Sequence, residues 1–105
     1  MRHYKLNEQG EPVACSLAEV MASGFPENGV VKREKLFNCS VSTVFLVFDH
    51  SQDDSGPPIL WETMVFGGKL NGYQTRCSGS REQAEAMHQS IINKVKQAYD
   101  TRTKE

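Results

Sequence analysis

Two strongly apolar segments, separated by a polar loop, dominate the hydrophobic pattern of the chain. Val41–Asp49 and Ile59–Phe66 consist largely of β-branched and aromatic residues, which favour strands. The intervening Ser51–Pro58 contains aspartates, a glycine and two prolines, as turns do. The pattern therefore predicts a hairpin. Because both alternating sets of side chains in the first segment are apolar, we expect its strand to be central and at least partly covered on both faces.

Weaker patterns predict four further strands. Two of them flank a polar segment that contains a glycine, which indicates a small N-terminal hairpin. The other two precede and follow the central hairpin in the sequence. These four segments are His3–Leu6, Pro12–Cys15, Val30–Phe37 and Tyr73–Cys77. The last of them would be a short edge strand.

Two helices are predicted from capping boxes, in which a serine is followed three residues later by Glu or Gln. Ser16 and Glu19 would begin a short helix, and Ser80 and Gln83 would begin a long one. Along the long helix, mainly apolar side chains repeat with helical spacing, so one stripe should face the sheet. The stripe consists of Ala84, Met87, His88, Ile91, Val95 and Ala98.

These elements predict a single α+β domain over residues 1–105. Residues 30–77 would form an antiparallel β-meander of about four strands, and a C-terminal helix at residues 80–100 would pack across one of its faces. Residues 1–29 would add the small hairpin and the short helix. A hydrophobic content of 38% is enough for one modest core.

Charge and cysteine content narrow the class of protein. The formal net charge is −1, which predicts no extensive nucleic-acid surface, and the basic segment at residues 31–35 is interpreted as a solvated strand face. Three cysteines without paired spacing favour reduced thiols over a disulfide framework or a zinc site. Residues 1–12 contain no apolar stretch typical of a secretory signal, and no apolar run in the sequence approaches the length of a membrane span. We therefore expect a cytoplasmic protein without membrane contact.

Ionisable residues in and near the central hairpin form a candidate site. Alternation along the strands places His50 and Glu62 on one face if paired residue numbers have an even sum, and one such pairing sets them directly opposite each other. His88 would join them if the long helix covers that face. Asp49 would join only if the strand end bulges.

Two chemistries suit this group. Two imidazoles and a carboxylate could hold a divalent metal with open positions, so His50, Glu62 and His88 are the candidate ligands. The same groups could act as general acid and base without metal. Each residue also has a structural interpretation. His50 would be a solvated loop residue, Glu62 would form a cross-strand ion pair with Arg76, and His88 would be a hydrogen-bonded core histidine. No cofactor other than such a metal is predicted.

The central hairpin contains a motif of the form VSTVFLxxDH…GPPxLxETMVFGG, over residues 41–50 and 56–68. In this motif the chain resembles small uncharacterised proteins of tailed bacteriophages and prophages. Further similarity lies at Tyr4–Asn7 and at Ala84, Glu85 and His88. Val47 and Trp61 depart from the glycine and phenylalanine of the family pattern. The resemblance implies a phage or mobile-element origin and a location in the host cytoplasm, and it implies no activity.

Three functions remain open at this point. A non-enzymatic binding protein, acting on a host or phage protein such as a host-defence component, agrees best with the small size and the absence of a complete catalytic motif. A metal-binding or hydrolytic protein would use the candidate site. A nucleotide or small-molecule module would need a pocket lined by Trp61, Phe66 or Tyr73. The edge strand Tyr73–Cys77 would permit a homodimer.

Overall fold

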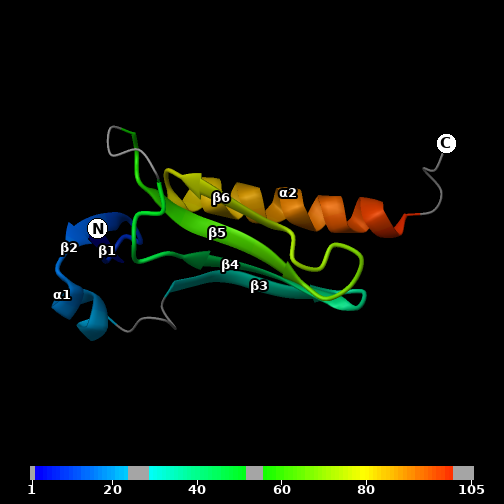
Figure 1. Ribbon diagram of the computed structural model, residues 1–105, viewed down its shortest axis with the longest axis horizontal. Coiled ribbons are helices and arrows are strands. Elements are labelled where there is room, and N and C mark those ends of the chain that lie inside the picture. Colours follow the sequence, from blue (N-terminus) through cyan, green and yellow to red (C-terminus); the bar gives the residue numbers. More distant parts are fainter. Residues whose placement is uncertain (1, 24–28, 52–55, 101–105) are drawn as a thin grey trace.

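A four-stranded antiparallel sheet with one long helix on one face forms the body of the molecule (Figure 1). The computed structural model describes residues 2–23, 29–51 and 56–100. The elements are β1 (His3–Leu6), β2 (Pro12–Cys15), α1 (Leu17–Ala22), β3 (Val30–Leu36), β4 (Cys39–Phe45), β5 (Ile59–Phe66), β6 (Gln74–Ser78) and α2 (Arg81–Tyr99). Strands β3 to β6 lie in sequence order in the sheet, and β1 and β2 form a separate hairpin. The predicted α+β fold is confirmed.

Local sequence signals account for where both helices begin. The predicted capping boxes are present at Ser16 with Glu19 and at Ser80 with Gln83. In each box the serine side chain accepts a hydrogen bond from a backbone N–H of the first turn, and the Glu or Gln side chain accepts one from the N–H of the serine. Residues 24–28, 52–55 and 101–105, which include parts of the predicted N-terminal unit and central loop, lie outside the described residues.

The register of β4 against β5 decides which residues of the central hairpin meet. Ser40 pairs with Phe66 and Val44 pairs with Glu62, so paired residue numbers have an even sum. Glu62 nevertheless lies opposite Val44 and not opposite His50. The reason is that regular pairing of β4 with β5 ends at Phe45. Beyond it the segment that follows β4 has extra residues relative to β5, since Leu46 bonds to Leu60 but His50 bonds to Ile59. The N–H of His50 donates to the Ile59 carbonyl at 3.0 Å.

The N-terminal hairpin extends the sheet beyond the end of β4. The N–H of Tyr4 donates to the Val47 carbonyl at 2.9 Å, and the N–H of Asp49 donates to the Arg2 carbonyl at 3.3 Å. Because residues 46–50 contact β5 on their other side, β1 pairs on the side of this segment where β3 pairs with β4. Helix α1 packs against β1.

A polar layer divides the core beneath α2 into two apolar clusters. The first cluster contains Tyr4, Val20, Phe45, Val47, Leu60, Trp61 and Ala84. The second contains Cys39, Val41, Val65, Ile91, Ile92 and Val95. Between them along the chain lie Thr43, Thr63 and His88, which are at most 1% exposed. The predicted helix stripe thus faces the sheet, with one histidine in its middle.

The opposite face of β3–β6 is open where β4 begins. Among the described residues no helix or strand packs over it, and α2 lies on the other side of the sheet (Figure 1). Strand alternation places Ser40, Ser42 and Val44 on this face. The strand over Val41–Asp49 was expected to be covered on both faces. In this part of the sheet, only the face towards α2 is covered.

Candidate functional site

His88 is the centre of a buried hydrogen-bonded chain that joins α2 to the sheet. Its Nδ1 lies 2.7 Å from Thr43 Oγ1, which in turn lies 2.5 Å from Thr63 Oγ1. Its Nε2 lies 2.8 Å from Glu34 Oε1. An ionised carboxylate only accepts, so Nε2 donates to Glu34, and in the neutral imidazole Nδ1 accepts from Thr43. The interpretation of His88 as a hydrogen-bonded core histidine is confirmed.

The same chain contains a hydroxyl, an imidazole and a carboxylate, which are the groups of a hydrolase triad. Thr43 is 0% exposed, however, so a substrate has no access to its hydroxyl. The hydrogen bond from His88 is the main cause that lowers the pKa of Glu34, and the Lys32 ammonium lowers it further against the effect of desolvation. The Glu34 carboxylate is therefore ionised at neutral pH, and the arrangement joins helix to sheet.

Glu62 lies on the opposite face of the sheet from His88. Its neighbour Thr63 points towards α2, and adjacent residues of a strand point to opposite faces. Glu62 pairs with Arg76 across β5 and β6, and its Oε2 lies 2.8 Å from Arg76 Nε. The interpretation of Glu62 as one half of a cross-strand ion pair is confirmed.

His50 and Asp49 belong to the chain segment that follows β4. Asp49 Oδ1 accepts hydrogen bonds from the N–H groups of Ser51 at 2.8 Å and Ile59 at 3.0 Å. These two bonds are the main cause that lowers the pKa of Asp49 below its usual range. The exposed His50 ring has its Nδ1 2.7 Å from the Phe48 carbonyl oxygen. Both side chains thus fix the start of the connection to β5.

The four candidate residues are therefore distributed over three places. His50 and Asp49 lie after β4, Glu62 lies on the open face, and His88 lies beneath the other face. A shared site required α2 to cover the face of β5 that carries Glu62, whereas α2 covers the face that carries Thr63. Within residues 2–23, 29–51 and 56–100, no group of three or more His, Cys, Asp or Glu could hold a metal ion.

The aromatic residues expected around a small-molecule pocket are also apart. Trp61 is 0% exposed in the core, and its Nε1 donates to the Gly79 carbonyl at 2.8 Å. The ring of Tyr73 lies beneath the Lys94 ammonium, and Lys94 Nζ is 5.5 Å from the ring centroid. Phe66 is 51% exposed and points away from α2. These three side chains do not surround one cavity.

The side chains that point away from α2 form the open face, which has a regular chemical pattern. Beside the β3–β4 turn, six of them stand in three columns, which we call the cation column, the serine column and the apolar column. The columns are Arg33 and Lys35 on β3, Ser40 and Ser42 on β4, and Met64 and Phe66 on β5. Val44, Glu62, Gln74 and Arg76 point to the same face further along the sheet. The register aligns Lys35, Ser40 and Phe66 in one row across the sheet. Because serine side chains are shorter than those of the two flanking columns, the serine column lies lower, and we call the strip above it the trough.

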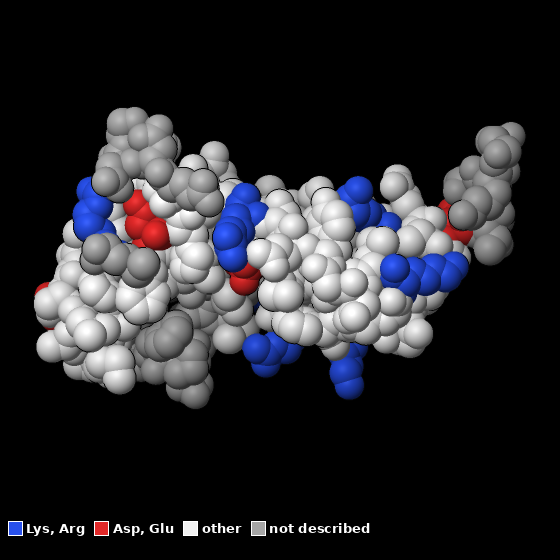
Figure 2. Space-filling view, in the orientation of Figure 1, with Lys and Arg blue, Asp and Glu red and all other residues white. Residues whose placement is uncertain are grey.

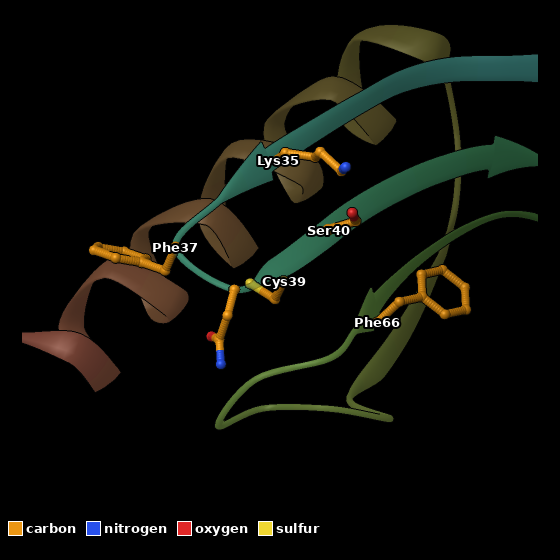
Figure 3. A pocket seen from close by; sticks show the side chains of 6 residues that line it. Lys35, Phe37, Cys39, Ser40 and Phe66 are labelled. Atoms are coloured by element: carbon orange, nitrogen blue, oxygen red, sulfur yellow. The ribbon is translucent and has the colours of Figure 1, made fainter.

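A hollow of about 310 Å³ lies at one end of this trough, beside the β3–β4 turn. It is lined by Lys35, Phe37, Asn38, Cys39, Ser40 and Phe66. In Figure 3, Lys35, Ser40 and Phe66 project from three neighbouring strands in front of the sheet, whereas Phe37 lies over α2. Phe37 stacks on Tyr99 of α2 with ring centroids 4.4 Å apart. The hollow between these residues is open to solvent.

The cation column differs from most basic side chains of the protein. In the described part of the chain, no ion pair or hydrogen bond engages the exposed side chains of Arg33 and Lys35. Most other basic residues have partners, as in Arg2–Asp49, Lys5–Glu19, Lys32–Glu34, Arg76–Glu62 and Arg81–Glu85. Figure 2 shows Lys and Arg projecting from the lower edge of the view, where β3 lies, below a mostly uncharged surface. Lys and Arg lie elsewhere on this view too, so what distinguishes the cation column within the described residues is the absence of an ion-pair partner.

Sequence reasoning missed the open face because it interpreted the basic segment only as solvated. A signal was present, since Arg33 and Lys35 alternate with Lys32 and Glu34, and Ser40 and Ser42 alternate with Cys39, Val41 and Thr43. The alternation separates the two faces of each strand. Assigning the cations to the same face as the serines required the β3–β4 register, which the sequence leaves open.

No protein-family model matches the chain, and comparisons with curated proteins and with solved structures found no match. Within the described residues, no helix is long and apolar enough to cross a membrane. The interpretation of function therefore depends on the chemistry of the surface.

Proposed function

We propose that this chain is a small binding protein of phage or prophage origin that acts in the host cytoplasm on a host or phage protein. The partner would present an acidic segment to the open face. The observation that carries the proposal is the cation column, beside an uncovered trough and an apolar column. The motif of the central hairpin supports the phage origin.

The chemistry of the open face favours an acidic partner with some apolar side chains. Arg33 and Lys35 are alternate residues of one strand, so they stand about 6.7 Å apart on the same side. Carboxylates that approach them relieve the repulsion between the two cations. Charge complementarity of this kind raises association rates and selects partners, while Met64 and Phe66 offer apolar surface for burial.

Two other partners suit the open face less well. Single-stranded nucleic acid needs a basic path with several aromatic platforms, whereas Phe66 is the one aromatic side chain that the described residues place in the three columns. A second copy that paired β3 with β3 would bring the cation columns of both chains together on one face, which is unfavourable. An acidic protein segment avoids both difficulties.

Charge reversal on the open face tests this proposal. The probe is a fluorescein-labelled peptide of about 15 residues that contains Glu and Leu, and a peptide with Gln for each Glu is its neutral control. Each exposed ion pair contributes up to about 1 kcal/mol, and reversal replaces attraction by repulsion. We expect R33E/K35E to weaken binding of the acidic peptide at least about tenfold by fluorescence anisotropy.

The matched control is K94E/K96E, which makes the same change of net charge on α2. It should leave binding within about twofold of the unchanged protein. Equal losses in the two double variants, equal binding of the acidic and neutral peptides, or tighter binding of a thymidine oligonucleotide than of the acidic peptide would each contradict the proposal.

A further inference from the structure

We infer that the partner occupies the trough as an amphipathic α-helix, with acidic side chains on one flank and apolar side chains on the other. This inference rests on the proposed function, because it assumes that the open face is the binding surface. It adds the form of the bound segment and its orientation. The acidic flank would lie along the cation column, the apolar flank along the apolar column, and small residues over the serines.

The dimensions of the trough suit a helix. The cation and apolar columns are on strands separated by one intervening strand, so they stand about 9.5 Å apart. A helix with its side chains is about 10 Å across. Successive rows of the sheet are about 6.7 Å apart along the strands, and side chains four residues apart on a helix rise by about 6 Å. Carboxylates at positions i and i+4 can therefore approach Lys35 and Arg33 in turn.

Backbone hydrogen bonding also favours a helix over an extended segment. A helix satisfies its own N–H and carbonyl groups, whereas an extended chain lying across Met64 and Phe66 would bury such groups without partners. An extended chain could instead pair with the outer edge of β3. In that position it would stay two strands away from β5, so it would leave the trough and Phe66 uncovered.

The other face of the same sheet shows how a helix fits these strands. Helix α2 packs against all four strands β3–β6, and small Ala84 lies fully buried where it meets the sheet. A partner helix on the open face would complete a three-layer arrangement, helix on both sides of one sheet. Ser40 and Ser42 keep the floor low enough for its close approach, and the hollow beside Phe66 accommodates one larger side chain.

Peptides that differ only in their ability to form a helix test the inference. The probe is an acidic amphipathic peptide of about 18 residues, which spans about 27 Å as a helix. Its Glu residues lie on one flank, its Leu residues on the other and Ala between them. A second peptide carries one Pro in place of an Ala on the side that would face solvent, so that it keeps every contact group but loses the helix. We expect the Pro peptide to bind at least about tenfold more weakly.

A substitution in the trough locates the binding site. Ser40→Leu fills the floor beside the hollow and should weaken binding of the helical peptide at least about tenfold, whereas Ser90→Leu on the exposed side of α2 should not change it. Thermal unfolding of both variants checks that they remain folded. A peptide with Lys in place of Glu should bind R33E/K35E better than it binds the unchanged protein, which tests the orientation through charge exchange.

The outcomes separate this inference from the proposed function. If the Pro peptide binds as tightly as the Ala peptide, or if Ser40→Leu has no effect, the helix in the trough is contradicted while acidic binding remains. If R33E/K35E binds the acidic helical peptide as well as the unchanged protein does, the proposed function itself fails.

Discussion

The two faces of one sheet treat polar groups in opposite ways. Towards α2, the hydroxyls of Thr43 and Thr63 and the ring of His88 are buried and hydrogen-bonded, and among the described residues no buried side-chain N or O atom lacks a partner. On the open face, the cation column has no internal partner within the same residues, and Phe66 is 51% exposed. Polarity on the covered face thus serves the fold. On the open face Glu62 and Arg76 pair with each other, whereas the cation column is available to a partner.

The polar layer on the covered face fixes where α2 sits. Of the two apolar clusters on either side of it, one is rich in aromatic residues and the other is aliphatic, and the hydrogen bonds of His88 add a directional constraint to their packing. A shift by one turn would separate His88 from both Thr43 and Glu34 and leave buried polar groups without partners. The hydrogen-bonded chain therefore selects one position of the helix.

Truncation of one large residue on each face should give the largest difference between them. Trp61→Ala removes a fully buried ring and its hydrogen bond to Gly79, so we expect a loss of about 4 kcal/mol in the free energy of unfolding. Phe66→Ala, in the same strand but on the open face, should cost less than about 1 kcal/mol. Urea unfolding measures both. Similar losses would show that the two faces are equally packed.

Removal of a single hydroxyl should have an intermediate effect. Thr43→Val keeps the shape of the side chain but leaves His88 Nδ1 and the Thr63 hydroxyl without their shared partner. We expect a loss of about 1–3 kcal/mol in the free energy of unfolding. The double variant Thr43→Val with Thr63→Val should lose less than the sum of the two single variants, because both belong to one network.

Thr75→Val is the matched control for this series, because no hydrogen bond of its hydroxyl is found among the described residues and it lies partly exposed on β6. Its effect should stay within about 0.5 kcal/mol. Additive effects of Thr43→Val and Thr63→Val would contradict a hydrogen-bonded chain.

Local signals made most of the fold predictable. Capping boxes at Ser16 and Ser80 marked both helix starts, and β-branched and aromatic residues gave Ile59–Phe66 with its observed limits. These signals depend on neighbouring residues in the chain, so one sequence contains them. The end of β4 was predicted less well because residues after Phe45 continue to be apolar, although their pairing partner changes to include β1.

The candidate site could not be predicted to the same degree, because it depends on contacts between residues that are far apart in the sequence. Strand alternation puts Glu62 on the same face as Met64 and Phe66, while the register against the preceding strand is left open by the sequence. The pairing of Glu62 with Arg76 is one of the interpretations that the sequence supports. Which face α2 would cover was not determined by the helix stripe alone. That choice separates His88 from Glu62 and leaves the cation column exposed.

The smallest effect should come from the charge at the solvent end of the buried chain. Glu34→Gln keeps an acceptor for His88 Nε2 but removes the negative charge. The hydrogen bond from His88 lowers the pKa of Glu34 in the folded protein, so the charge adds stability above the ordinary glutamate pKa, and this contribution disappears as the pH falls through the lowered pKa. The Glu34 side chain is 38% exposed, so solvent screening keeps the effect smaller than that of Thr43→Val.

Unfolding experiments between about pH 7 and pH 2 check this expectation. The unchanged protein should be more stable than Glu34→Gln at neutral pH, and the difference should vanish at the acidic end. The control Glu8→Gln alters an exposed carboxylate in the turn of the N-terminal hairpin and should follow the unchanged protein throughout. A difference between the unchanged protein and Glu34→Gln that persisted at the lowest pH would mean that shape, and not charge, explains the role of Glu34. The covered face would then depend on its uncharged hydrogen bonds alone, which would make its contrast with the charged open face sharper still.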